Sequence, residues 1–281
     1  MEKQPQQAAS LRKRTIPMKK RVFSAIVLLS ITLPCILLSE YSRTILFAVA
    51  ACLCAYEWAH EFGRKGIACV TWVMYLFVTG EVALVLLHVD GASHQILFIG
   101  CIYCCLITGI FLKNVSSRGA LCTAAGLAYP CTLFAAVMKI GVSEIWFETL
   151  TLACLSTWVC DSFAMFGGQR FGKHAVAPQI SPNKTVEGCM WGAASSLVTG
   201  LIIYCVKLLP DVSLAVCVLT AFVASTMGQI GDLAESSVKR LLVIKDFSNL
   251  IPGHGGMMDR ADSLLFSIPT AYLCLTIFGL A

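Results

Sequence analysis

Acidic residues occur in two closely spaced pairs near the C-terminus of the chain. Asp232 precedes Glu235 by three positions, and Asp259 precedes Asp262 by three positions. If each pair is helical, its two carboxylates point to one face. Carboxylates brought together repel one another unless a cation lies between them, and Mg²⁺ binds one or two carboxylates together with waters and phosphate oxygens. The spacing therefore indicates a site where a divalent cation and a phosphate group meet.

Basic side chains lie among these acids and supply the opposite charge that phosphate needs. They are Lys239, Arg240, Lys245 and Arg260. Lys239 and Arg240 suit lipid headgroups as well as a substrate phosphate, and the sequence leaves both uses open. Asp246, beside Lys245, is predicted to support the site.

A glycine-rich turn separates the two acid pairs, with the sequence Pro252-Gly253-His254-Gly255-Gly256. Glycine permits positive φ and close approach of the backbone to a ligand. We expect the turn to contact substrate through His254 and Gly255. His254 could donate to phosphate, exchange a proton or only shape the turn, and its type alone does not decide between these roles.

A second polar segment, residues 167–187, precedes an apolar stretch. Lys184 lies where a helix is expected to begin, and a lysine beside free N–H groups at a helix start favours phosphate. Capping of that helix is a sufficient explanation for Thr185. The residues predicted to bind substrate here are Lys173, Ser181, Asn183 and Lys184.

The spacing of Gly167, Gly172 and Lys173 resembles a phosphate-binding P-loop. That motif requires Ser or Thr at the next position and a preceding strand, whereas this chain has His174 after an apolar helical stretch. We therefore exclude a P-loop. The glycines could still form an anion-binding nest.

Isolated acids in apolar stretches are a third feature. An ionisable group within a membrane span is by default a candidate for function, so Asp161 is predicted to support the site, with a position at the headgroups as the alternative. Glu81 predicts a buried partner or a wet cavity, and the sequence does not identify the partner. Glu57, His60 and Glu61 share one helical face. An interfacial cluster is favoured for them, and support of the site is the alternative.

The composition indicates what must position these residues. The chain has 281 residues, of which 57% are hydrophobic and 13% charged, and its mean hydropathy is +0.78. Soluble domains carry roughly 25% charged residues, and each membrane span needs about 20 apolar residues. We predict an all-α polytopic membrane protein with about nine transmembrane helices and a polar active-site cavity at the cytoplasmic face. The predicted spans are residues 22–39, 44–61, 67–88, 95–112, 120–138, 145–166, 188–208, 213–231 and 261–280.

The basic residues test this arrangement. With the N-terminus in the cytoplasm, all but three of the 21 lysines and arginines fall on the cytoplasmic side, the exceptions being Arg43, Lys139 and Lys207. This bias agrees with the positive-inside rule. We expect a basic cytoplasmic arm at residues 1–21, a single transmembrane catalytic domain at residues 22–281, and an active site facing the cytoplasm at the cell's inner membrane. The net charge of +5 favours anionic lipids, and no aromatic-interleaved basic strip indicates nucleic-acid binding.

Most of the 15 cysteines lie within the apolar spans. Cys101 and Cys104 form a C-x-x-C motif, but no second pair or nearby histidine supplies the other ligands of a metal site. We interpret the cysteines as small apolar packing residues.

The run S-x-x-K-R-x-x-x-x-K-D-x-x-x-x-x-P-G-H-G-G-x-x-D-R-x-D, from Ser236 to Asp262, resembles the signature of the phosphatidate cytidylyltransferase (CDP-diacylglycerol synthase) family. The upstream sequences GQIGDLAES and ISPNKTVEG, and Asp161 with the following GKH loop, are similar to that family too. The resemblance covers about residues 155–265. The family commonly has Trp where this chain has Val186, and an aromatic residue at the position of Ser237 or Val238; none of these positions carries charge chemistry.

The resemblance implies transfer of a cytidylyl group from CTP to phosphatidic acid with release of pyrophosphate. It also implies Mg²⁺, a second cation such as K⁺ in some members, contact with membrane lipids and a homodimer. Asp232 and Asp259 would hold the cations, and the further acids Glu235 and Asp262 would be secondary ligands or would orient waters. Lys184, Lys245 and Arg260 would neutralise phosphate charge.

Two other function classes remain to be compared. A transporter or channel would have acids spread through the membrane depth and broken helices in matching halves, whereas the charge here gathers at one face. A CTP-dependent polyprenol kinase would release CDP instead of pyrophosphate, so product analysis distinguishes it.

Overall fold

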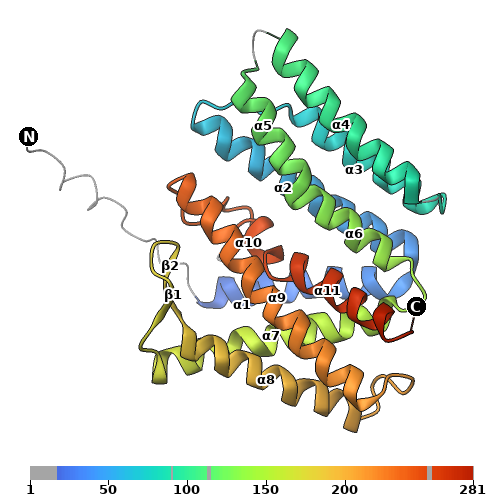
Figure 1. Cartoon of the computed structure of the whole chain (residues 1–281), viewed down its shortest axis with the longest axis vertical. Helices are drawn as coiled ribbons and strands as arrows, with labels where there is room; N and C mark the ends of the chain where they lie inside the picture. The colour runs from blue at the N-terminus through green and yellow to red at the C-terminus, as the bar shows by residue number, and fades with distance from the viewer. Residues whose placement is uncertain (1–17, 90, 113–114, 252–254, 281) are drawn as a thin grey trace, which may run out of the picture.

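The computed structural model describes residues 18–89, 91–112, 115–251 and 255–280. Nearly all of its regular structure is helical (Figure 1). The helices are α1 (Met18–Leu38), α2 (Glu40–Arg64), α3 (Thr71–Leu86), α4 (Gly91–Phe111), α5 (Ser117–Gly126), the π-helical turn η1 (Leu127–Cys131), α6 (Thr132–Gly141), α7 (Trp146–Phe171), α8 (Val186–Cys205), α9 (Leu214–Leu241), α10 (Met258–Ala261) and α11 (Leu264–Ile277). The antiparallel strands β1 (Ala175–Ala177) and β2 (Ser181–Thr185) form a hairpin between α7 and α8.

Every predicted span corresponds to helical structure, with α5, η1 and α6 together forming the fifth. Within the described part of the chain, six helical segments are long and apolar enough to cross a membrane. They are residues 40–64, 91–111, 117–141, 146–171, 186–205 and 214–241. The apolar parts of α1 and α3 are shorter, and α11 has 14 residues. The prediction of an all-α polytopic membrane protein is confirmed. The predicted arm lies largely outside the described residues, and α1 already begins at Met18.

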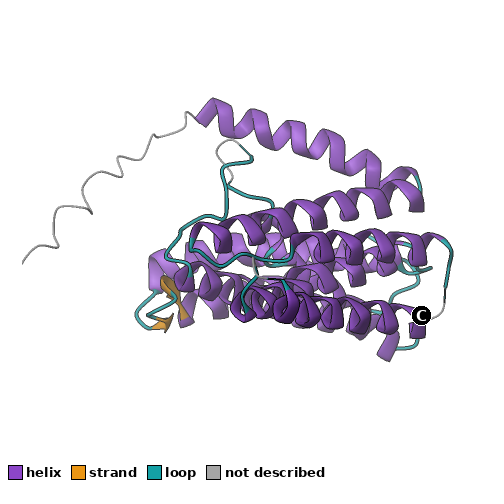
Figure 2. Ribbon diagram, turned by 90° about the horizontal axis from the view of Figure 1, so that it is seen from above, coloured by secondary structure: helices purple, strands orange, loops and turns teal. Residues whose placement is uncertain are grey.

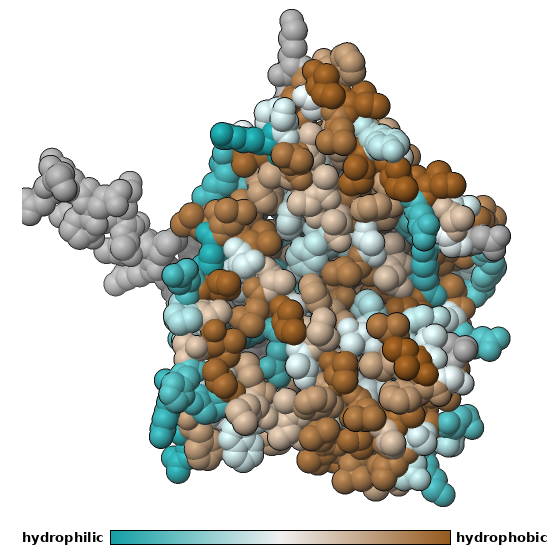
Figure 3. All heavy atoms as spheres, in the orientation of Figure 1, coloured by the Kyte–Doolittle hydropathy of each residue, from teal (hydrophilic) through white to brown (hydrophobic). Residues whose placement is uncertain are grey.

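The surface has the polarity that a membrane requires. Figure 2 shows the helices side by side with roughly parallel axes and the β-hairpin at one end of them. In Figure 3 apolar side chains cover most of the visible face, and polar side chains gather toward the left and right edges. Large apolar residues such as Ile110, Phe111 and Met190 are exposed. An apolar belt between polar ends is favourable in lipid and unfavourable in water.

The helices form two groups, seen in the upper right and lower parts of Figure 1. One contains α2 to α6, and the other contains α7, α8, α9 and α11. Packing of α11 on α6 joins them, and one buried apolar core runs from Ala50 in α2 to Ala271 in α11. In the first group, the buried acid Glu81 lies 2.6 Å from Nδ1 of His94, which supplies the partner that the sequence could not identify.

The two polar segments fold onto each other at one end of the bundle. Nε of Arg240, near the end of α9, donates to the carbonyl of Ile180 beside the hairpin at 2.8 Å. Lys184 in β2 pairs with Asp232 in α9, its Nζ lying 2.5 Å from Oδ2. Segments that the sequence predicted on the same side of the membrane are therefore in contact.

Glycines allow close approach of α7, α8 and α9. A Cβ on Gly167 of α7 would lie 2.5 Å from Cβ of Trp191 in α8. A Cβ on Gly200 of α8 would lie 2.7 Å from the carbonyl oxygen of Cys217 and from Cα of Val218 in α9. Gly167 through Phe171 belong to α7, which agrees with excluding a P-loop and gives Gly167 a packing role.

We expect Gly200→Ala to destabilise the fold, because the added methyl group would meet the α9 backbone, which cannot turn aside. Overpacking of this kind costs about 1–3 kcal/mol, and the midpoint of thermal unfolding in detergent would fall. Gly100→Ala in α4 is the matched control, since a Cβ added there would have no neighbouring atom within 4 Å. That variant should be neutral or stabilised by up to about 1 kcal/mol. Equal midpoints for the two variants would contradict the packing assigned to Gly200.

Candidate active site

A cavity of about 660 Å³ opens where α7, the hairpin, α8, α9 and α10 meet. Its polar lining comes from both predicted segments and includes Asp161, Asn183, Lys184, Gln229, Asp232, Asp259, Arg260, Asp262 and Ser263. Lys184 and Asp259 thus line one cavity, although 75 positions separate them in the sequence. The prediction that the two segments build one site is therefore supported by the geometry.

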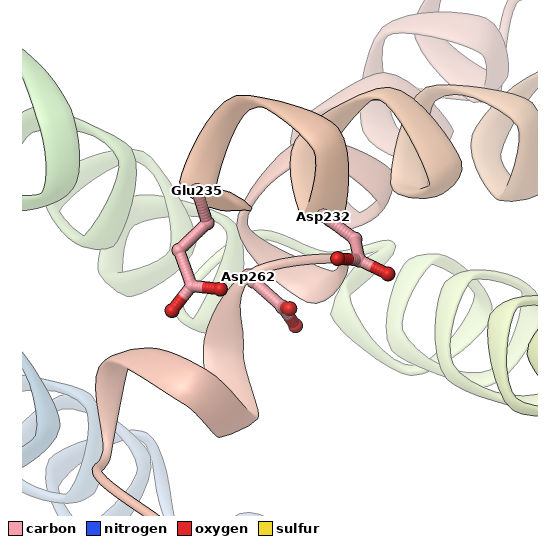
Figure 4. A group of neighbouring side chains, drawn as sticks. All are labelled: Asp232, Glu235 and Asp262. Atoms are coloured by element: carbon pink, nitrogen blue, oxygen red, sulfur yellow. The ribbon is translucent and has the colours of Figure 1, made fainter. Parts of the chain in front are cut away.

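Three carboxylates at this site converge on one point. Asp232 and Glu235 project from α9 one turn apart, and Asp262 projects from the turn between α10 and α11 (Figure 4). Each offers an oxygen, and the three oxygens lie within 4.8 Å of one another. The spacing of three predicted for Asp232 and Glu235 does place both on one helical face.

This group of acids fits a small divalent cation. Glu235 is fully buried, and its Oε1 accepts no hydrogen bond from any residue that the structure describes. An unpartnered buried carboxylate oxygen is costly unless a cation or ordered water completes it. A bound cation would stabilise such a carboxylate.

Close backbone contact brings Asp262 to α9. A Cβ on Gly231 would lie 2.5 Å from the carbonyl oxygen of Asp262, and a Cβ on Gly228 would lie 3.3 Å from that of Ser263. Only small residues at these positions in α9 let the two segments approach so closely. The acids therefore converge because α9 carries glycine immediately before Asp232.

The hairpin contributes a cation to the cavity. The side chains of Lys184 and Asp232 are 26% and 29% exposed, so solutes can reach their ion pair. Thr185 caps α8 by accepting a hydrogen bond from the N–H of Gly188, as its sequence position predicted. Lys184 is thereby fixed directly before the N-terminus of a helix, where anions are favoured.

Lys239 lies inside the acid cluster. Its Nζ lies 2.5 Å from Oε2 of Glu235 and 3.0 Å from Oδ1 of Asp259, and its side chain is 12% exposed. It therefore offsets the charge of two buried acids. Its predicted contact with substrate has no support from this geometry and stays a prediction.

Asp259 differs from the other acids in its partners. Besides Lys239, it accepts hydrogen bonds through Oδ2 from the backbone N–H groups of Phe247 (2.9 Å) and Gly256 (2.8 Å). The pair predicted from the spacing of Asp259 and Asp262 is thus divided, since Asp262 joins the convergent acids and Asp259 binds the preceding segment. Asp259 still lines the cavity, and its predicted role as a cation ligand stays a prediction.

The other predicted residues lie at varied distances from the cavity. Asp161, Asn183 and Arg260 line it. Lys245 and Asp246 are exposed and are absent from the lining, as far as the structure describes it. Arg240 is engaged with backbone carbonyls of Ile180 and Ile244.

The remaining predicted residues belong to the loops. Ser181 and Lys173 lie in or near the hairpin, where the backbone N–H of Lys173 donates to Glu187. Gly255 has φ of +85°, the conformation expected for a glycine in this turn. His254 lies outside the described residues.

Gln229 was not identified from the sequence, and the role of Glu57 was left open. Gln229 lines the cavity one turn before Asp232, and its position on the same helical face as the acids could have indicated this. Glu57 in α2 is 1% exposed and binds the segment before α10, which supports the alternative considered for it over an interfacial position. The sequence signal for Glu57 was its place near the end of an apolar helix, on one helical face with His60 and Glu61.

Comparisons with known proteins identify the family of this chain. Residues 19–278 match the sequence model of the cytidylyltransferase family. A phosphatidate cytidylyltransferase of Brucella abortus (strain 2308) is 35% identical over 271 residues, which cover 93% of this chain and 94% of that protein. A phosphatidate cytidylyltransferase of Bacillus subtilis (strain 168) is 45% identical over 127 residues, which cover 45% of this chain and 47% of that protein.

The matched region spans both helix groups and includes every residue of the cavity. The Brucella alignment extends over nearly all of both chains, so the similarity is not confined to the charged segments. The chain belongs to the cytidylyltransferase family.

Proposed function

We propose that this protein transfers the cytidylyl group of CTP to phosphatidic acid, giving CDP-diacylglycerol and pyrophosphate for phospholipid biosynthesis. The proposal is supported by the family, by the activity for which the relatives are named and by the cavity. The observation that carries it is the convergence of Asp232, Glu235 and Asp262 beside Lys184 and Arg260. Two phosphate-bearing substrates need such a combination, because their negative charges must be neutralised before they can approach each other.

Asp232, Glu235 and Asp262 are the residues that would hold Mg²⁺. When bound, the ion would neutralise phosphate charge and stabilise charge developing in the transition state. The acids themselves would fix its position, since two project from one turn of α9 and the third is held by the close contact at Gly231. A second cation such as K⁺ stays a prediction from the family resemblance.

Lys184 and Arg260 would receive the phosphate groups of the substrates. Both line the cavity with the convergent acids. Lys184 pairs with Asp232, and a cation bound to that carboxylate would weaken the pair and free the ammonium group for phosphate. The phosphatidate oxygen would attack the α-phosphorus of CTP in line with the departing pyrophosphate. No general base is required, because the attacking phosphate is already ionised.

The location of the cavity suits a soluble and a lipid substrate together. It opens at the end of the apolar bundle, beside the β-hairpin. Together with the distribution of basic residues, this supports an inner-membrane protein with its N-terminus and active site on the cytoplasmic side, where CTP is available. Homodimerisation stays a prediction from the family resemblance.

Product analysis is the direct test of the proposal. Purified protein with labelled CTP, phosphatidic acid and Mg²⁺ is expected to give CDP-diacylglycerol and pyrophosphate in equal amounts. Release of CDP with a phosphorylated lipid would instead identify a kinase. Absence of both products in a folded preparation would contradict the proposed activity.

Removal of the cation should abolish synthesis. A chelator in excess over Mg²⁺ is expected to stop the reaction, and added Mg²⁺ should restore it. Asp262→Asn should lower kcat/KM on the order of 10²-fold, because losing one ligand weakens cation binding and activity together. Asp211→Asn is the matched control, as Asp211 is exposed in the connection between α8 and α9. Near-normal synthesis by Asp262→Asn would show that this acid is not a ligand.

Comparing Lys184, which lines the cavity, with the exposed Lys245 would test whether the cavity is the phosphate site. Lys184→Ala is expected to lower kcat/KM by at least about tenfold, since a charge-assisted contact with phosphate contributes roughly 1.5–3 kcal/mol. Lys245→Ala tests the catalytic role predicted for that exposed residue. A larger loss for Lys245→Ala than for Lys184→Ala would mean that the cavity in this structure is not the complete phosphate site.

A further inference from the structure

The segment between α9 and α10 is tied to α2 by one buried carboxylate. Oε1 of Glu57 accepts hydrogen bonds from the Ser248 hydroxyl at 2.5 Å and from the Met257 N–H at 2.9 Å. Oε2 of the same side chain accepts a hydrogen bond from the N–H of Met258 at 2.9 Å. Glu57 thus binds both ends of residues 248–257, a segment about 190–200 positions away in the sequence.

These contacts fix the position of the carboxylate closely. Glu57 is 1% exposed, and a buried carboxylate is tolerated only when hydrogen bonds or opposite charges compensate it. A Cβ on Gly256 would lie 2.6 Å from Oε1 of Glu57, so the segment reaches the carboxylate only because residue 256 is glycine. The close packing of Glu57 against this segment therefore requires glycine at position 256.

The anchored segment leads directly into the proposed cation site. Met258, which donates to Glu57, is the first residue of α10, and Asp259 and Arg260 follow it. Asp262 comes directly after α10. Asp259 also binds backbone close to the Glu57 contacts, since it accepts hydrogen bonds from the N–H groups of Phe247 and Gly256. The placement of Asp262 against α9 hence depends on where Glu57 holds the start of α10.

We propose that Glu57 is a positioning residue of the active site. It acts through the backbone at Met257 and Met258 to hold Asp262 beside Asp232 and Glu235. The inference rests on the proposed function only in that it takes the three acids as the cation site. It makes the N-terminal helix group part of the catalytic apparatus, although the acids themselves all come from the C-terminal group.

Cation binding without substrates provides the main test. Mg²⁺ binding to the purified protein in detergent would be measured by calorimetry, with Glu57→Gln compared to wild type. The expected result is affinity about 10-fold weaker, as found when residues that orient metal ligands are changed. The Mg²⁺ concentration for half-maximal synthesis should rise by a similar factor.

Glu61→Gln is the matched control. Glu61 lies one turn further along α2, is 4% exposed and pairs with Arg64 instead of the anchored segment. Its Mg²⁺ affinity should equal that of the wild type. If Glu57→Gln only lowers the yield of folded protein or its thermal stability, while the remaining protein binds Mg²⁺ normally, the positioning role is wrong.

Two milder variants keep the test decisive if Glu57→Gln does not fold. Ser248→Ala removes one of the hydrogen bonds to Glu57 and should weaken Mg²⁺ binding about threefold. Gly256→Ala should weaken it more, since its methyl group meets the Glu57 carboxylate, and adding Glu57→Asp should restore part of the loss by withdrawing that carboxylate. Normal binding by Ser248→Ala and Gly256→Ala would overturn the proposal, as would independent losses in the double variant.

A failure of this inference differs from a failure of the proposed function. Wild-type protein that binds Mg²⁺ but makes no CDP-diacylglycerol would contradict the function and leave the role of Glu57 testable by calorimetry. Wild-type protein that makes the product, with Glu57→Gln unchanged in Mg²⁺ affinity, would contradict the role of Glu57 alone.

Discussion

Repulsion between buried carboxylates is the constraint on which this structure depends. Two carboxylates about 4 Å apart repel by roughly 4 kcal/mol at an effective dielectric constant of about 20. The protein gathers Asp232, Glu235, Asp259 and Asp262 at one end of an apolar bundle. Lys239 offsets part of this charge from within, and Lys184 offsets part of it from the hairpin. The negative charge that the two lysines do not offset attracts cations. The repulsion between the carboxylates and the proposed binding of a cation therefore have the same cause.

The helices around these acids pack closely enough to keep the acids near one another. Glycines in α8 and α9 bring backbones within contact, and Gly231 places the turn of Asp262 directly on α9. An apolar side chain at such a position would separate the acids by the width of the added atoms. In lipid, where apolar surface gains nothing by leaving the solvent, small residues at helix contacts are the main means of close packing. The same glycines thus serve both the bundle and the site.

Sequence patterns predicted the elements of this fold well, because each helix carries its own information. Apolar runs located the long helical segments but not the short helix α10 or the β-hairpin, and helical periodicity placed Asp232 and Glu235 together. The contacts between segments were harder to predict from the sequence. The partner of Glu81 is His94 on the next helix, and nothing in the sequence selects that histidine over others. Asp259 accepts hydrogen bonds from the N–H groups of Phe247 and Gly256, which lie outside the helices, and residues outside helices have no period from which direction can be inferred.

The role of Glu57 illustrates why such contacts arise at membrane surfaces. An irregular segment beside a bundle leaves backbone N–H groups without helical partners, and burying them unpaired is unfavourable. Here Glu57 and Asp259 accept hydrogen bonds from Phe247, Gly256, Met257 and Met258. One carboxylate accepts hydrogen bonds from several backbone N–H groups and so fixes their relative positions. Solvent water would accept the same hydrogen bonds but would leave those positions free. An enzyme that joins a soluble nucleotide to a lipid must place its site where helices end, so part of its backbone there has to be held by side chains instead of by helical hydrogen bonds. Buried acids that bind backbone meet this need, and Asp259 does so while also lining the cavity.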